Sequence, residues 1–271
     1  MSEQSTFQAP APAGTIQTLL RKDWRGLVLP LAFVLVWWAV TTLGLVNTKL
    51  IVPPADVVTT AYRFITGGTF FDGLGASLWR DGAGFVIGSL AGVAFGALVG
   101  VSRWANRIVG PTFHTFKHIS LFAWLPLIST WLGQGDVAKI LFVALSAFYP
   151  VALGTLEGVK GIARAQLEVA RVYAFNRWQL LFKLVLPAAS PQILAGLHLA
   201  LIYAWLATIG AEYLLAKSGP GLGDAVIQGK AAFNVPLVVF GMLIIGFVGA
   251  FFNQIAARIE ARLLRWRDVR R

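Results

Sequence analysis

The sequence predicts an all-α integral membrane protein with six transmembrane helices. Of its 271 residues, 57% are hydrophobic and only 13% are charged, against the ~25% charged residues that soluble domains usually contain. A water-soluble fold with so few charged side chains could not cover its surface with polar groups. Apolar segments near the ~20 residues that cross a bilayer recur along the whole chain.

Six apolar stretches account for the predicted spans. They cover residues 27–46, 82–101, 113–132, 137–156, 191–215 and 236–257. The third is the weakest, because His114, Lys117 and His118 enter its first turns. We expect residues 27–257 to form one transmembrane domain.

A short amphipathic helix is predicted between the first two spans. Pro53 and Pro54 precede it, and Gly67 and Gly68 end it, as expected for helix boundaries. Its apolar residues fall on one helical face: Val57, Val58, Ala61, Phe64 and Ile65. We expect this helix to lie on the outer surface of the membrane and to shield the bundle.

The basic residues predict the orientation of the chain. With both termini in the cytoplasm, 17 Lys and Arg lie inside and six lie outside, namely Lys49, Arg63, Arg80, Lys139, Lys217 and Lys230. This distribution follows the positive-inside rule. Residues 1–26, expected to be disordered, and residues 258–271 are then basic cytoplasmic tails. The net charge of +11 serves orientation against anionic lipid rather than nucleic-acid binding.

The second span carries five glycines at four-residue intervals: Gly84, Gly88, Gly92, Gly96 and Gly100. Each glycine costs up to ~1 kcal/mol of helix propensity in water, so the run needs a reason. In lipid, small residues one turn apart let a second helix backbone approach closely. We therefore expect tight helix packing; a surface that slides during gating is the alternative.

Ionisable side chains within the spans are candidates for function, because burying them is costly. Glu212 and His198, both in the fifth span, are candidates for the translocation path or its gate. Each could instead hydrogen-bond a neighbouring helix, and Glu212 could also reach water. His114 and His118 lack a third ligand and do not predict a metal site. The chain has no cysteine and no recognisable catalytic motif, so we expect neither catalysis nor a cofactor bound by this chain.

A polar, basic segment at residues 157–187 interrupts the apolar pattern. It reads EGVKGIARAQLEVARVYAFNRWQLLFKLVLP, and its five Lys and Arg place it on the cytoplasmic side. Residues 164–175 predict an amphipathic helix that lays its apolar face into a groove on a soluble partner, with charges that fix its register. A helix that lies on lipid headgroups is the alternative. We expect Pro187 to break the helix before the fifth span.

This segment resembles the EAA loop of permease subunits of ABC importers. From Glu168 the chain reads EVARVYA, then nine residues, then LVLP, against the family pattern EAA, three residues, Gly, nine residues, I-x-L-P. Val169 replaces an alanine, Leu184 stands in place of isoleucine, and Ala174 replaces the glycine. Because alanine is poor at positive φ, we expect a continuous or modestly bent helix at Ala174.

Further blocks resemble the nitrate/taurine/aliphatic sulfonate group of these permeases. They are IVPPADVV at 51–58, SLWR at 77–80, AWLPL at 123–127 with Trp131 and Gly133, and AEYLLAKSGPGLG at 211–223. The resemblance implies a type I importer fold and a homodimer of permeases in the bacterial inner membrane. It also implies a cytoplasmic ATPase dimer that holds ATP and Mg, an extracytoplasmic substrate-binding protein, and a small anionic or zwitterionic solute.

We expect seven residues to couple the permease to the ATPase: Glu168, Ala170, Arg171, Tyr173, Ala174, Phe175 and Pro187. ATP hydrolysis then takes place in the separate partner subunit, and this chain is not an enzyme. A secondary transporter, or another polytopic membrane protein without an ATPase, is the alternative. The sequence shows neither the intramembrane charge relay nor the repeat symmetry typical of secondary transporters.

Overall fold

The computed structural model describes residues 25–48, 50–215 and 219–264, and no strand occurs among them. The predicted N-terminal tail up to residue 24, and residues 265–271 of the predicted C-terminal tail, lie outside this part. The chain divides into two compact units, one up to Ala55 and one from Asp56 onward. The predicted all-helical fold is confirmed.

The first unit consists mainly of helix α2 (Arg25–Thr42). The helix covers most of the first predicted span and ends four residues earlier than predicted, ahead of Gly44, whose φ is +67°. The indole Nε1 of Trp37 donates a hydrogen bond of 3.0 Å to the Val52 carbonyl oxygen. This bond fixes the connection that follows α2 against the helix.

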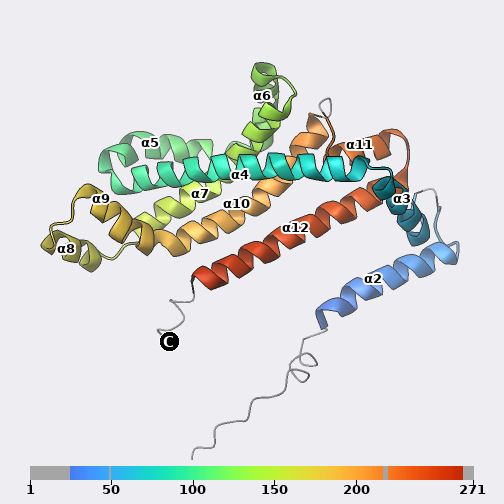
Figure 1. Cartoon of the computed structure of the whole chain (residues 1–271), viewed down its shortest axis with the longest axis horizontal. Helices are drawn as coiled ribbons and strands as arrows, with labels where there is room; N and C mark the ends of the chain where they lie inside the picture. The colour runs from blue at the N-terminus through green and yellow to red at the C-terminus, as the bar shows by residue number, and fades with distance from the viewer. Residues whose placement is uncertain (1–24, 49, 216–218, 265–271) are drawn as a thin grey trace, which may run out of the picture. The chain divides into compact units, whose positions relative to one another are not determined.

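The second unit contains all the remaining helices. They are α3 (Pro54–Thr66), α4 (Thr69–Val101), α5 (Arg103–Phe116), the 3₁₀ helix η1 (Leu121–Trp124), α6 (Leu125–Leu132), α7 (Asp136–Lys160), α8 (Arg164–Val172), α9 (Arg177–Gln179), the π-helix η2 (Leu180–Val185), α10 (Leu186–Leu214), α11 (Leu222–Ala231) and α12 (Val235–Leu263). Within this unit, α8 and α9 lie at one end of the long helices, and α3 and α11 lie at the other (Figure 1).

The predicted count of six spans is not exact. Among the described residues, four helical stretches are long and apolar enough to cross a membrane: α4, α7, the continuous stretch α9–η2–α10, and α12. The third predicted span is broken, because α5 ends at Phe116 and η1 and α6 follow a turn. Lys117 and His118 are poorly suited to an apolar helix, and Pro126 stands at the start of α6, where its missing N–H is tolerated.

The predicted amphipathic helix is confirmed as α3, which begins at Pro54 and ends before the two glycines; its place on the outer surface of the membrane stays a prediction. The ring of Phe64 packs edge-on against Phe70 of α4 and Phe240 of α12, with centroids 6.2 Å apart in both pairs. These contacts attach α3 to the end of the bundle that also holds α11.

The expected break at Pro187 is wrong. The helix runs from Arg177 through Leu214, and the residues just before the proline form the π-helical turn η2. Proline lacks an N–H, and its ring crowds the carbonyl group one turn earlier. A wider π turn relieves that crowding without ending the helix.

The five glycines of α4 lie against α7. Each faces a residue of α7, and the partner advances by four residues at every step: Gly84 with Val143, Gly88 with Ala147, Gly92 with Val151, Gly96 with Thr155, and Gly100 with Val159. A Cβ atom on Gly92 would lie only 2.9 Å from the Val151 Cβ. The constant step shows that α4 and α7 run parallel at a separation that only glycine permits. Two parallel helices require a return segment between them, and α5, η1 and α6 supply it.

Helix α10 packs antiparallel on another face of α7. A Cβ on Gly154 would meet the Gln192 carbonyl at 2.7 Å, and a Cβ on Gly196 would meet the Pro150 carbonyl at 2.9 Å. Helix α7 is therefore enclosed by small-residue contacts on two sides, and half of its apolar window is buried inside this chain.

Replacing Gly92 with alanine should destabilise the bundle, because the added methyl group forces α4 away from α7. Overpacking of this kind typically costs about 1–3 kcal/mol. Gly82→Ala is the matched control, because a Cβ on this glycine of the same helix has nothing within 4 Å. Thermal unfolding in detergent, followed by loss of the monodisperse gel-filtration peak, should show a lower midpoint for Gly92→Ala alone. Equal midpoints for the two variants would contradict the packing argument.

Candidate functional site

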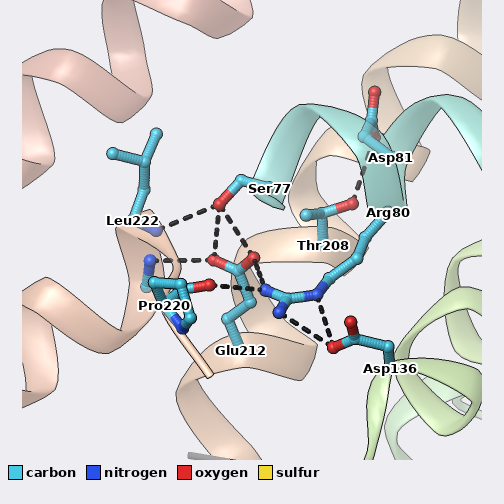
Figure 2. Close-up of polar contacts among 9 residues, drawn as sticks. Ser77, Arg80, Asp81, Asp136, Thr208, Glu212, Pro220 and Leu222 are labelled. Atoms are coloured by element: carbon cyan, nitrogen blue, oxygen red, sulfur yellow. Dashed lines mark hydrogen bonds and ion pairs between the residues drawn. The ribbon is translucent and has the colours of Figure 1, made fainter. Parts of the chain in front are cut away.

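A buried polar cluster joins four segments at the α11 end of the bundle (Figure 2). The Arg80 guanidinium, only 2% exposed, is central to it. Its Nη1 donates to Glu212 Oε1 at 2.8 Å and to the Pro220 carbonyl oxygen at 3.0 Å. Its Nε and Nη2 both reach Asp136 Oδ1, at 2.9 and 2.8 Å. One side chain of α4 therefore links α7, α10 and the segment before α11.

The Glu212 carboxylate is fully buried and accepts hydrogen bonds from Arg80, Ser77 and Gly223. The Ser77 hydroxyl lies 2.8 and 2.9 Å from its two oxygens, and the Gly223 N–H donates at 3.0 Å. The Leu222 N–H in turn donates to the Ser77 hydroxyl at 3.0 Å. The carboxylate thus caps the first turn of α11, where a negative charge is favourable.

Gly221, just before α11, and Gly223, in its first turn, lie so close to Glu212 that no side chain fits at either position. A Cβ on Gly221 would lie 2.6 Å from the Glu212 carboxylate, and one on Gly223 would lie 2.8 Å from the Glu212 Cβ. Beside the cluster, the Thr208 hydroxyl donates to Asp81 Oδ1 at 3.1 Å. The structure therefore places Glu212 in interhelical hydrogen bonds, one of the three arrangements that the sequence left open. Its role as a gate stays a prediction.

His198 lies between α10 and α12. Its Nδ1 is 2.8 Å from Glu260 Oε2, and its Nε2 is 2.8 Å from Asn253 Oδ1. Both contacts are with side chains of α12, which continues to Leu263, beyond the predicted end of the sixth span. The structure therefore does not bring His198 together with Glu212.

The predicted coupling residues gather at the opposite end, on and after α8. The helix ends at Val172, and the chain then turns, because Ala174 adopts a positive φ of 50°. The Phe175 N–H donates to the Ala170 carbonyl at 3.0 Å, and the Ala174 N–H donates to the Arg171 carbonyl at 2.9 Å. This pair of bonds is the Schellman arrangement, in which glycine normally takes the left-handed position. The expected continuous or modestly bent helix is therefore wrong. The chain makes the left-handed turn at Ala174 even though alanine replaces the glycine of the family pattern.

Helix α8 presents most of its surface outward. Ala170 is buried, whereas Val172 and Tyr173 are 84% and 72% exposed. Trp178 and Phe182, also exposed, stack with centroids 5.9 Å apart. A cluster of large apolar side chains beside charged residues is typical of a surface that contacts another protein.

A cavity of about 770 Å³ opens between α7, α10 and the segment around η1. Its apolar lining includes Phe122, Leu153 and Leu199, and its polar groups come from Lys117, Ser120, Ser146, Tyr149, Glu157, Gln192 and Tyr203. Neither Glu212 nor His198 is among the lining residues. The cavity is of a size that holds small molecules.

Sequence reasoning missed two buried cations and the cavity. Arg80 and Lys139 were counted on the outer side of the membrane with no prediction of burial, and both are buried at 2% exposure. The signal for Arg80 was present in the SLWR block, where Arg80 stands one helical turn after Ser77 and directly before Asp81. The cavity could not be predicted, because three segments distant in sequence form it together and no local sequence pattern shows how they pack.

A bundle of long apolar helices with an open internal cavity and an exposed amphipathic helix at one end defines a polytopic membrane permease. The chain belongs to the family of binding-protein-dependent transport system inner membrane components, which residues 84–266 match. Its relatives identify it as an ABC importer permease of the nitrate/taurine/sulfonate group, as the sequence blocks predicted.

Three similar proteins illustrate the group. The putative aliphatic sulfonates transport permease protein SsuC of Bacillus subtilis is 33% identical, covering 92% of this chain and 90% of that protein. The taurine transport system permease protein TauC of Escherichia coli is 30% identical over 85% of each. The bicarbonate transport system permease protein CmpB of Synechococcus elongatus is 30% identical, over 90% of this chain and 93% of that protein.

A solved structure has the same fold. A chain of the MetNI methionine ABC transporter in an inward-facing conformation aligns with a TM-score of 0.59 at 19% identity, covering 70% of this chain and 94% of that one. The type I importer fold is therefore confirmed.

Replacing Arg80 with methionine should destabilise the protein by about 3–5 kcal/mol, because Glu212 would remain buried without its cation. The double variant Arg80→Met/Glu212→Leu should recover part of that loss, since no unpaired charge stays buried. Arg63→Met, at an exposed arginine of α3, is the control. Melting temperatures of the unmodified protein, Arg80→Met, Glu212→Leu and the double variant form a double-mutant cycle. Strictly additive losses in this cycle would contradict the ion pair.

Replacing Ala174 with glycine should stabilise the end of α8 by up to about 1 kcal/mol, because glycine adopts positive φ without the Cβ penalty. Ala165→Gly, in the first turn of the same helix, is the control and should loosen α8, because glycine has a lower helix propensity than alanine. Amide hydrogen exchange of α8 should slow in the first variant and accelerate in the second. Faster exchange in both would show that the turn at Ala174 is not left-handed.

Proposed function

We propose that this chain is the membrane-spanning subunit of an ATP-driven importer and forms the translocation path for a small anionic or zwitterionic solute. It pairs with a second permease subunit, contacts a cytoplasmic ATPase dimer, and receives solute from an extracytoplasmic binding protein. The observation that carries this proposal is the exposed surface formed by the end of α8 and the residues up to α9, where Val172, Tyr173 and Trp178 are exposed. Family membership supports the same assembly.

The α8 end of the bundle is cytoplasmic in this proposal, and the α11 end faces the binding protein. The excess of basic residues around α8 and both chain termini supports this orientation. The seven predicted coupling residues then lie at or near the contact with the ATPase.

ATP acts in the partner subunit, and this chain converts its motion into a change of access. Binding of ATP closes the ATPase dimer and moves the α8 helices of the two permeases toward each other. The cavity between α7 and α10 then changes from inward-facing to outward-facing, and hydrolysis resets it. ATP and Mg are held by the ATPase, so this chain needs no cofactor of its own.

The substrate class follows from the relatives, whose names include aliphatic sulfonates, taurine and bicarbonate. We propose a solute of this kind, such as an aliphatic sulfonate, taurine or nitrate. All of these are small enough for a cavity of about 770 Å³.

Replacing Tyr173 with alanine should weaken ATPase binding and lower ATP-driven uptake at least about tenfold, as removal of a central aromatic side chain from an interface commonly does. Trp104→Ala is the matched control, because Trp104 is a similarly exposed aromatic residue, 78% exposed, at the same end of the bundle. Both variants should insert into the membrane normally. Co-purification of the ATPase and uptake into proteoliposomes provide the two measurements.

Glu168→Lys and Ala174→Val should uncouple transport in the same way, because the first reverses a charge on α8 and the second places a β-branched residue at positive φ. Unchanged ATPase capture and uptake in all three α8 variants would contradict the coupling role. Transport that continues without any ATPase subunit would instead favour a secondary transporter.

A further inference from the structure

The cavity between α7, α10 and η1 has an uneven charge distribution. Among its lining residues, Lys117 is the one cation and Glu157 the one anion. Gln192, two tyrosines and two serines add neutral hydrogen-bonding groups, and the remaining wall is mostly apolar. An ionisable side chain in such a place is a functional candidate, because its burial in a membrane is costly.

Lys117 lies near the middle of the long helices rather than at their ends. It follows α5 directly, one turn after Phe113. The Phe113 ring stacks on Tyr149 with centroids 6.0 Å apart and contacts Phe95 at 5.0 Å. Tyr149 is the thirteenth residue beyond Asp136 in the 25-residue helix α7, so this contact marks the middle of that helix.

The Lys117 ammonium has no ion pair or hydrogen bond to any residue that the structure describes. Arg80, by contrast, has three oxygen partners and stays away from the cavity. Lys117 is half-buried on the cavity wall and has no anionic partner among the described residues. Its ammonium group is therefore available to bind an anionic solute. The carbonyl groups at the end of α5 favour a cation there but leave its cavity-facing side free.

Glu157 makes no ion pair with Lys117, although both line the cavity. It is eight residues beyond Tyr149 on α7, or about 12 Å along the axis at 1.5 Å per residue. The two charges therefore lie at different levels of the cavity, and the site at Lys117 favours the acidic group of the solute, whether or not an amino group is present.

We propose that Lys117 is a transit site for the acidic group of the transported solute, with Ser120, Ser146 and Tyr149 as neutral neighbours. The inference rests on the proposed function, and it identifies the residue that gives the path its preference for anions. Glu157 lies at the end of the cavity that is cytoplasmic in the proposed function. Its negative charge then repels the anion and favours release of the anion into the cytoplasm.

The test uses the absence of cysteine from the chain. A single Ser120→Cys substitution places a thiol three residues from Lys117 on the cavity wall. In the complete importer in membrane vesicles, the thiol is labelled with anionic sulfonatoethyl methanethiosulfonate or with the cationic trimethylammonioethyl analogue. Lys117→Met or Lys117→Gln should lower the ratio of anionic to cationic labelling rates at least about fivefold, because a unit charge at short range acts strongly at an effective dielectric near 20.

Lys117→Arg should keep this ratio, and so should Lys160→Met, which removes an exposed cation near Asn106 outside the cavity. ATP-driven uptake of taurine, ethanesulfonate and bicarbonate is measured in parallel without the cysteine. The neutral Lys117 variants should lower uptake at least about fivefold by the same electrostatic argument, while arginine and the Lys160 control retain it.

An unchanged labelling ratio, or normal anion uptake by the neutral variants, would overturn the role of Lys117 and leave the proposed function intact. Failure of the unmodified importer to take up any of the three anions would contradict the proposed substrate class. The labelling ratio would in that case still show whether Lys117 attracts anions to the cavity.

Discussion

The close approach of α4 to α7 is the contact on which the rest of the second unit depends. Lipid provides no hydrophobic force that brings two apolar helices together, so dispersion between closely spaced backbones must do so. The five glycines provide that contact over more than four helical turns. Because the two helices run parallel, the chain between them must return from the end of α4 at Val101 to the start of α7 at Asp136. The broken segment α5–η1–α6 makes this return, and it brings Lys117 to the wall of the cavity.

The cluster around Arg80 fixes the same helices at their α11 end by a different kind of interaction. A buried ion pair is a poor source of net stability, because desolvation offsets much of its attraction. Its value lies in specificity: Arg80 and Glu212 satisfy each other only when α4, α10 and the segment before α11 are in one register. The glycines around the N-terminus of α11 serve this arrangement, since a side chain at Gly221 would displace the carboxylate.

The sequence predicted features that depend on local pattern. The glycine interval, the amphipathic helix α3 and the polar segment around α8 all follow from periodicity and from breakers at their ends. The ion pair of Arg80 with Glu212 could not be predicted in this way, because its partners are 132 residues apart. Ala174 shows a second limit: intrinsic preference disfavoured a left-handed turn, yet two backbone hydrogen bonds hold one there. Pro187 failed as a helix breaker because a π turn accommodates its ring.

The position of α8 in the chain gives the proposed coupling role a physical route to the cavity. Helix α8 follows α7 after three residues and leads into the continuous stretch that becomes α10. Both neighbours line the cavity, and they are joined at this end by a packed cluster of Val159, Val185 and Ala189. Ala170 is buried while the neighbouring Val172 and Tyr173 are exposed, so α8 has one face toward the bundle and one toward the proposed partner. With the opposite end held by the Arg80 cluster, we expect a displacement of α8 to shift the connected ends of α7 and α10 and so to alter the cavity that both helices line.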